Sequence, residues 1–356
     1  MISLPPTLQH HLQTPLTIGP LTLSSRVFQS PLAGVTDRVF RRLVRRYAPE
    51  SMVFTEMVQA AGVHQGQRAT HLIMDIRPEE VPIGVQLFDC RPDFMATAAQ
   101  AAIDAGAWII DLNMGCPVNK VTRKGGGSSL LRQPEVAEAI VAQVAQVTQA
   151  ASIPVSVKTR IGWSDEDITI LDFARRMEAA GAQMLTIHGR TRSQGYNGPA
   201  RWEWIRRVKE VVQIPVIANG DITSLDAALQ CLAATGADGV MCARGTLGYP
   251  FLVGEIEHFL KTGTRLPAPT WTDRLRCAQD HLRDLVAYKG QRGLYQSRKH
   301  LAWYVKGFEG AAEWRQQLSR IESVEEGLAL LEAAIAQNPD RQDSPRSPDP
   351  IPCTSL

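Results

Sequence analysis

A cysteine held between a glycine and a proline is the residue in this sequence with the clearest capacity for chemistry. Cys116 follows the apolar run at 108–114 and precedes the glycine-rich segment GGGSSLL at 125–131. Gly115 and Pro117 predict a loop here, whereas free cysteines usually lie among core side chains. A free thiol has a pKa of about 8.5 and is mostly protonated at pH 7. It can therefore donate a proton as it stands, whereas nucleophilic attack would need a neighbouring base.

Cationic residues end two further apolar runs. Lys158 and Arg160 close the run PVSVKTR, and His188 begins the segment HGRTR, which contains Arg190 and Arg192. A lysine in this position suits either a Schiff base or a fixed positive charge. The histidine is either a site residue or a core residue. The two arginines either bind an anionic group or lie on a solvated face.

Short β-branched runs alternate with longer amphipathic segments along most of the chain. Strands of a parallel sheet are buried on both faces and read as near-continuous apolar runs, so this alternation predicts such a sheet covered by helices. The predicted strands span 26–31, 51–57, 82–88, 108–114, 154–160, 183–189, 215–221 and 238–245. The predicted helices between them include 37–47, 92–106, 134–147 and 224–236.

The number of strand–helix units selects among the parallel folds. Eight units within about 250 residues match a (β/α)8 TIM barrel. The alternative is an open doubly wound sheet, which usually carries G-x-G-x-x-G after its first strand. The first strand here runs into PLAGVTD at 31–37, which does not match that pattern. We therefore predict a TIM barrel over residues 1–262.

The active site of such a barrel lies at the C-terminal ends of its strands, and in this sequence those ends are polar. The polar ends are Thr55 to Met57, Gln86, Asn113 to Pro117, Lys158 to Arg160, His188 to Arg192, Asn219 to Asp221 and Ala243 to Gly245. Polar ends that face one mouth predict a binding site. The last two carry glycine and precede helices, so their N–H groups are candidates to bind a phosphate. Glycines that serve turn geometry alone are the alternative.

The pattern changes after residue 262. Residues 271–318 read as helices, and the fifty residues 271–320 carry a net charge of +5 and seven aromatic residues. The last twenty residues contain five prolines and no periodicity. We predict a small all-helical domain at 263–336 and a disordered Pro-rich tail at 337–356.

Composition narrows the class of protein. The chain has 356 residues, a net charge of +2, 44% hydrophobic and 21% charged residues, as an ordinary globular protein does. Its six cysteines are widely spaced with no C-x-x-C pair, which argues against a disulfide framework or a structural zinc site and fits a reducing compartment. No signal peptide or membrane span is recognisable. We expect a cytoplasmic, monomeric protein with no metal.

Taken in order, the strand ends resemble those of the tRNA-dihydrouridine synthase family, over residues 15–320. The most specific motif is DLNMGCPVNKV at 111–121. The others are PLAGVTDRVFR at 31–41, TEMV at 55–58, VKTRIGW at 157–163, HGRTRSQGYNGPARW at 188–202, IANGDI at 217–222, GVMCARGTLGYP at 239–250 and RKHLAWYVKG at 298–307.

The resemblance implies an FMN enzyme that reduces a uridine of tRNA to 5,6-dihydrouridine with NADPH. Reduced FMN would give a hydride to C6, and Cys116, at the position of the family's catalytic acid, would give a proton to C5. The family's flavin-contacting positions correspond to Pro31, Leu32, Ala33, Gln86, Asn113, Lys158, His188, Asn219, Gly220, Asp221, Ala243 and Arg244. Two positions depart from the pattern: Leu32 replaces a frequent methionine, and Ala243 replaces a common glycine.

A tRNA substrate gives the basic C-terminal segment a function. Contacts to the RNA backbone are predicted for Arg190, Arg192, Arg298, Lys299 and His300. Trp303 and Tyr304 either contact RNA or pack the helical domain. Two other readings remain: an FMN barrel that acts on a small free pyrimidine, as dihydroorotate dehydrogenases do, and an RNA-binding scaffold with an inactive barrel.

Overall fold

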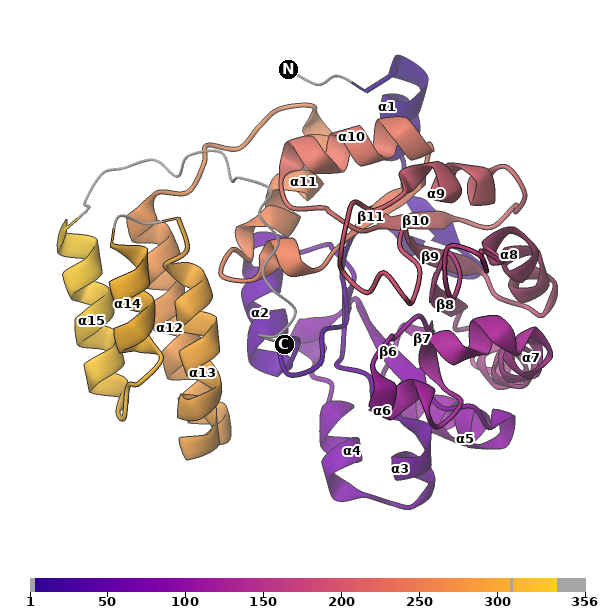
Figure 1. The fold of residues 1–356 in the computed structure, drawn as a ribbon, viewed down its shortest axis with the longest axis horizontal. Helices are drawn as coiled ribbons and strands as arrows, with labels where there is room; N and C mark the ends of the chain where they lie inside the picture. Colours follow the sequence, from indigo (N-terminus) through magenta and orange to yellow (C-terminus); the bar gives the residue numbers. More distant parts are fainter. Residues whose placement is uncertain (1–3, 308–309, 338–356) are drawn as a thin grey trace.

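The computed structural model describes residues 4–307 and 310–337 and contains a barrel of parallel strands (Figure 1). Neighbouring strands follow the order β3-β11-β10-β9-β8-β7-β6-β4, and a parallel bridge between Phe28 and Met52 joins the two ends. The strands are β3 (Val27–Gln29), β4 (Val53–Phe54), β6 (Ile83–Phe88), β7 (Ile109–Met114), β8 (Val155–Arg160), β9 (Met184–His188), β10 (Val216–Asn219) and β11 (Gly239–Cys242). The predicted TIM barrel and its eight strands are confirmed.

Helices cover the outside of the barrel and return the chain from each strand to the next (Figure 1). They are α2 (Arg38–Tyr47), α3 (Ala60–His64), α4 (Arg68–Ile73), α5 (Pro92–Asp104), α7 (Pro134–Ala150), α8 (Ile170–Ala179), α9 (Trp202–Lys209), α10 (Leu225–Thr235) and α11 (Phe251–Thr262). Two short elements lie in the loops, β5 (Val58–Gln59) and α6 (Asn119–Thr122). Local sequence sets the helix ends. For example, Ser224 accepts a hydrogen bond from Ala227 N at 3.1 Å to begin α10, and Gly236 ends it at φ +63°.

An N-terminal hairpin plugs the barrel at the end opposite the predicted site. The chain begins with α1 (Pro6–Gln13), followed by the antiparallel strands β1 (Leu16–Ile18) and β2 (Leu21–Leu23). Leu16, Ile18 and Leu23 share one apolar cluster with barrel side chains that include Phe28 and Met241. This plug was not among the predicted elements. A cavity lies at the other end of the barrel, where the strands end.

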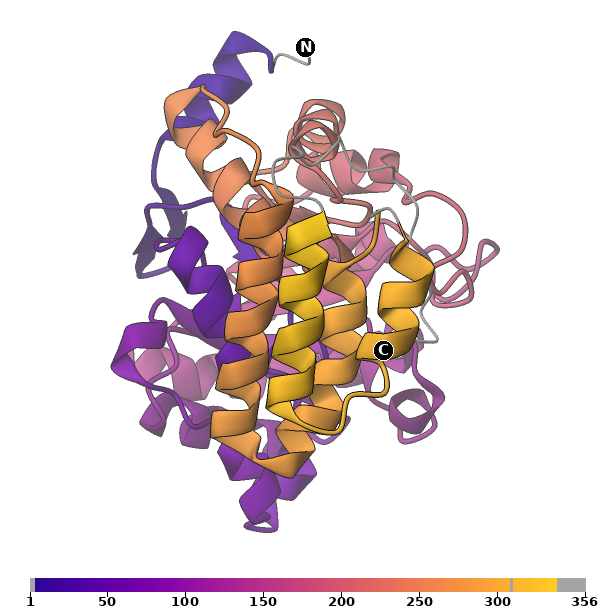
Figure 2. The same cartoon turned by 90° about the vertical axis from the view of Figure 1, so that its left-hand side faces the viewer.

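The C-terminal region is a set of four helices that lie side by side (Figure 2). They are α12 (Trp271–Lys289), α13 (Gln291–Tyr304), α14 (Ala311–Leu318) and α15 (Val324–Gln337). Their apolar core includes Leu43 of α2, so the helices pack directly against the barrel. The predicted helical region is confirmed. Of the predicted tail, only residue 337 belongs to the described part of the chain, as the last residue of α15, and residues 338–356 lie outside it.

The described residues contain neither a membrane-spanning helix nor a metal-binding cluster. None of the helices in residues 4–307 and 310–337 combines the length and apolar character needed to cross a membrane. Within the same residues, no group of three or more His, Cys, Asp and Glu side chains is arranged to hold a metal ion.

Candidate active site at the barrel mouth

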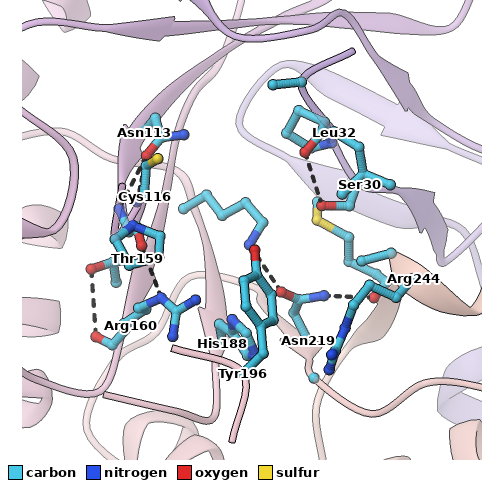
Figure 3. Close-up of a pocket in the computed structure, with 18 of the residues that line it drawn as sticks. Ser30, Leu32, Asn113, Cys116, Thr159, Arg160, His188, Tyr196, Asn219 and Arg244 are labelled. Atoms are coloured by element: carbon cyan, nitrogen blue, oxygen red, sulfur yellow. Dashed lines mark hydrogen bonds between the residues drawn. The ribbon is translucent and has the colours of Figure 1, made fainter. Parts of the chain in front are cut away.

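The ends of all eight barrel strands surround one cavity at the mouth of the barrel (Figure 3). The catalytic and flavin-contacting positions predicted from the sequence all line it. They are Pro31, Leu32, Ala33, Gln86, Asn113, Cys116, Lys158, His188, Asn219, Gly220, Asp221, Ala243 and Arg244. In Figure 3, Asn113 and Cys116 lie on one side of the cavity and Ser30 and Leu32 on the other. The parallel register explains this gathering, because it brings all the strand ends to one rim.

Cys116 lies on the wall of the cavity and is half-buried. Its backbone N–H donates to Oδ1 of Asn113 at 2.9 Å, and its carbonyl accepts from Ser128 N at 3.1 Å and Ser128 Oγ at 3.0 Å. The loop returns so closely that a Cβ at Gly127 would lie 2.7 Å from that carbonyl, at φ +59°. Glycine at 127 is therefore required for this approach. The backbone on both sides of the thiol is fixed.

The thiol is kept in its protonated form. Burial raises the pKa of Cys116, and the positive charges of Arg160 and Lys158 oppose this only in part. A thiol with a raised pKa remains a proton donor through neutral pH. The structure thus supports the proton-donating role over the nucleophilic one.

Lys158 projects into the cavity from β8. Its Nζ donates to Oδ1 of Asn219 at 2.9 Å, and Nδ2 of Asn219 donates to Met241 O at 2.9 Å. Burial lowers the pKa of Lys158, and the charge of Asp111 opposes that shift. The lysine is thus a positioned cation with a fixed acceptor and a buried counter-charge.

Two arginines that line the cavity, Arg160 at the end of β8 and Arg244 after β11, lie against the ring of one tyrosine. The ring of Tyr196 lies 5.4 Å from the guanidinium of Arg160 and 4.7 Å from that of Arg244. Burial, followed by the charges of the surrounding arginines and Lys158, holds the pKa of His188 well below its usual value. The imidazole is therefore neutral, and the positive charge belongs to the arginines. Tyr196 was not singled out from the sequence, because a lone aromatic residue in a loop carries no signal of its own.

Asp221 connects this basic cluster to the backbone. It accepts from Arg190 Nη2 at 2.8 Å and from Ala200 N at 2.7 Å, and its own backbone has φ +57°. A left-handed conformation at a residue other than glycine is a strained state that surrounding contacts must hold in place. The Ile222–Thr223 segment, which also lines the cavity, then leads into the N-terminus of α10, where free N–H groups favour an anion.

Two of the five predicted RNA contacts are buried. Arg190 is only 3% exposed and donates to Asp221 and to the carbonyl of Gly198, and His300 is 1% exposed inside the helical region. Neither side chain offers surface to an RNA. Trp303 and Tyr304 are also buried, which resolves their two interpretations in favour of packing.

The other three predicted RNA contacts are half-buried. Arg192 donates to Oδ1 of Asn119 at 2.8 Å and stacks over Trp163 at 4.7 Å. Arg298 donates through Nε and Nη2 to the carbonyl of Ile321, at 2.9 and 2.6 Å, so its guanidinium braces its own domain. Lys299 lies where the helical region meets the barrel, and a Cβ at Gly34 would be 3.2 Å from its Nζ.

Together, the fold and the site define a (β/α)8-barrel protein with a cationic, amide-lined cavity and a thiol of raised pKa on its wall. A family model described as dihydrouridine synthase matches residues 28–339. The chain is 65% identical over 322 residues to the probable tRNA-dihydrouridine synthase 1 of Synechocystis sp., with 90% of each chain covered. It is 39% identical over 322 residues to the tRNA-dihydrouridine synthase B of Pseudomonas aeruginosa, covering 90% of this chain and 96% of that one. This chain therefore belongs to the dihydrouridine synthase family.

The likeness to solved structures concerns the fold. Histamine dehydrogenase from Rhizobium sp. 4-9 superposes with a TM-score of 0.56 at 14% identity, covering 94% of this chain. The chain spans 65% of the length of that protein. At this identity the match supports the barrel architecture and nothing about substrate.

Proposed function

We propose that this protein is a tRNA-dihydrouridine synthase that uses FMN and takes its reducing equivalents from NADPH. The observation that carries the proposal is a protonated, loop-held thiol, Cys116, facing the same cavity as the cation of Lys158, in a member of the dihydrouridine synthase family. The product would be 5,6-dihydrouridine within a tRNA chain, and the protein would act in the cytoplasm as a monomer.

The residues that line the cavity support FMN as the cofactor. Gln86, Asn113 and Lys158 present amide and ammonium groups where a flat, hydrogen-bonding ring system can bind. At the other end, Arg244 and the glycine-bearing loop at Gly220 provide a cationic site for the phosphate. When bound, FMN supplies the hydride that adds to C6 of the uracil ring.

The remaining chemistry belongs to the protein. The thiol of Cys116 delivers a proton to C5, and a positioned general acid contributes about 10²- to 10⁴-fold to the rate. The ammonium of Lys158 stabilises negative charge beside the ring, because it is held by Asn219 and partly desolvated. Because Cys116 lines the cavity at the barrel mouth, the uridine must leave its base stack to reach it.

The RNA itself would lie across the barrel mouth and the four-helix region. We propose residues 1–262 as the catalytic domain and 263–336 as the tRNA-binding domain. Lys299, at their junction, and Arg192, beside the Cys116 loop, are the half-buried cations nearest the mouth among the predicted contacts. Such contacts hold the phosphate backbone and do not read sequence.

The test is to incubate the purified, FMN-loaded protein with unmodified tRNA and NADPH and to map dihydrouridine by mass spectrometry. Dihydrouridine at a defined position, absent when either FMN or NADPH is omitted, is the expected result. Reduction of free uridine or of a free pyrimidine carboxylic acid, with tRNA unchanged, would instead favour the small-substrate interpretation. A protein that binds FMN but reduces neither tRNA nor a free pyrimidine would contradict the proposed activity.

A further inference from the structure

A continuous chain of hydrogen bonds connects a buried acid in β7 to the loop that carries the thiol. Asp111 is fully buried; it accepts from Ser156 Oγ at 2.6 Å and from Gln86 Nε2 at 2.6 Å. Gln86 Oε1 in turn accepts from Asn113 Nδ2 at 2.8 Å. Asn113 Oδ1 then accepts from the N–H groups of Gly115 at 3.2 Å and Cys116 at 2.9 Å.

The chemistry of its two ends gives this chain a direction. An ionised carboxylate can only accept hydrogen bonds, so the amide nitrogen of Gln86 must face Asp111. Backbone N–H groups can only donate, so the amide oxygen of Asn113 must face the loop. Between these ends the two amides have one orientation in which every group is paired, and the structure adopts it.

We propose that Asp111 is a positioning residue, whose carboxylate orients the amides of Gln86 and Asn113 and thereby holds the Cys116 loop. Asp111 does not line the cavity, so it acts through the two amides that do. It also supplies the counter-charge of Lys158, which is the direct register partner of Asn113 on the neighbouring strand. The consequence for proton delivery rests on the proposed function, whereas the hold on the loop does not.

The direction of the chain predicts how two isosteric substitutions combine. Asn113→Asp replaces the amide nitrogen that donates to Gln86 with a second acceptor. The oxygen of Gln86 then faces a carboxylate oxygen with no hydrogen between them, either at 113 or, if the Gln86 amide turns over, at 111. Asp111→Asn in the same chain removes that conflict. Gln86 can then turn over, donate to the carboxylate introduced at 113 and accept from the amide introduced at 111, whose oxygen still accepts from Ser156. Asn113→Asp should therefore be harmful with aspartate at 111 and tolerated with asparagine there, where the amide introduced at 111 can pair with Ser156 in either direction of the chain.

The experiment compares the wild type, D111N, N113D and the double variant as full-length chains without flavin. It measures the unfolding midpoint and the rate of iodoacetamide alkylation at Cys116, located by peptide mass mapping. Cys231, which is fully buried in α10, reports general unfolding. We expect N113D to speed alkylation of Cys116 by about tenfold, as for loss of one or two buried hydrogen bonds, with little change at Cys231. The double variant should be slower in alkylation and higher in midpoint than N113D, and should match D111N in both.

Two outcomes would overturn the inference. One is that N113D has the same effect whichever residue stands at 111. The other comes from repeating the four-way comparison with Gln86→Met, which removes the amide link but keeps the charges in place. If the effect of N113D still depends on the residue at 111 when position 86 is methionine, the dependence is a direct charge effect and the amides do not transmit it. If N113D fails to fold, comparing D111N with the double variant still tests the inference. A double variant that is alkylated faster at Cys116 or has a lower unfolding midpoint than D111N contradicts it. None of these readouts depends on activity toward tRNA, so the inference and the proposed function can fail separately.

Discussion

The ammonium of Lys158 donates to the side-chain oxygen of Asn219 at 2.9 Å, although 61 positions separate them in the chain. They lie on β8 and β10, which are separated by β9, so the bond crosses the barrel interior. Asn219 is itself fixed by its bond to Met241 O. The lysine therefore has one preferred position in the cavity before any ligand arrives, which is the arrangement expected of an electrostatic catalyst.

Replacing this cation should weaken flavin binding and shift its redox balance. We expect Lys158→Met to lower flavin affinity and to make the reduction potential of the bound flavin more negative by tens of millivolts, because a positive charge near the ring favours the reduced form. Fluorescence titration and spectroelectrochemistry measure the two effects. The control is Lys261→Met, which removes a lysine of α11 that pairs with Glu50. It should change neither the flavin affinity nor the reduction potential. Equal effects in both variants would show that only net charge matters.

The same substitution should change how stability depends on pH. Burial raises the pKa of Asp111, and the charge of Lys158 opposes that rise. Removing Lys158 therefore raises the folded-state pKa of Asp111 further above its value in the unfolded chain. The folded state of Lys158→Met then binds more protons than the unfolded state between those two values, and stability falls as pH rises through them. Denaturant titrations from pH 4 to pH 8 should show the variant losing more stability than the wild type over that range. A pH-independent difference would contradict the coupling.

Removing the thiol should separate catalysis from cofactor binding. Cys116→Ala should keep its flavin and lose about 10²- to 10⁴-fold in the rate of dihydrouridine formation. Because burial raises the pKa of Cys116, the wild-type rate should stay flat through neutral pH and fall only above the ordinary range of a thiol. Cys90→Ala is the matched control, since Cys90 is also a half-buried free thiol near this loop. Full activity of Cys116→Ala would remove the proposed acid.

The sequence predicted the residues of the site well because parallel strands collect their C-terminal ends at one rim. Lys158 and Cys116 could be assigned to the mouth from their places after apolar runs, without knowledge of any contact. Burial and long-range pairing could not be predicted in this way. His300 lies in an amphipathic, basic segment but is buried beside Phe40 of α2 and His281 of α12. The buried acid Asp111 reads as an ordinary strand residue until its partners Gln86 and Ser156 are seen.

The N-terminal hairpin shows a second limit of sequence reasoning. Its two strands span three residues each, too short for a periodic pattern. Its role as a plug depends on barrel side chains such as Phe54 and Ile109, which are distant in the sequence. The hairpin becomes recognisable only once the barrel is closed and one end needs to be filled.

An ion pair anchors the helical region to the barrel. Lys289 of α12 donates to Oδ2 of Asp37, which also accepts from Gln296 Nε2 at 3.0 Å, and Asp37 is only 5% exposed. Lys289→Met leaves this carboxylate without its cation, so we expect the free energy of unfolding to fall by about 1–3 kcal/mol. Arg283→Met, which breaks an exposed pair with Asp280 on the same helix, should cost less than about 0.5 kcal/mol. If urea titrations show the same loss of unfolding free energy in both variants, the burial of Asp37 does not make its ion pair more stabilising than an exposed one.

Lys299 should contribute to RNA affinity through charge alone. It lies beside Gly34 at the rim of the barrel, and burial lowers its pKa while the nearby carboxylates Glu56 and Asp37 raise it. If it contacts one phosphate, Lys299→Met should weaken tRNA binding and reduce the slope of log affinity against log salt concentration by about 0.7–0.9. Arg206→Met removes the same charge from the exposed face of α9 and should leave the slope unchanged. Filter binding between 50 and 300 mM salt, about the range over which phosphate contacts weaken strongly, measures both slopes. If the two variants shift the slope equally, the RNA senses only the overall charge, and Lys299 is not part of the interface.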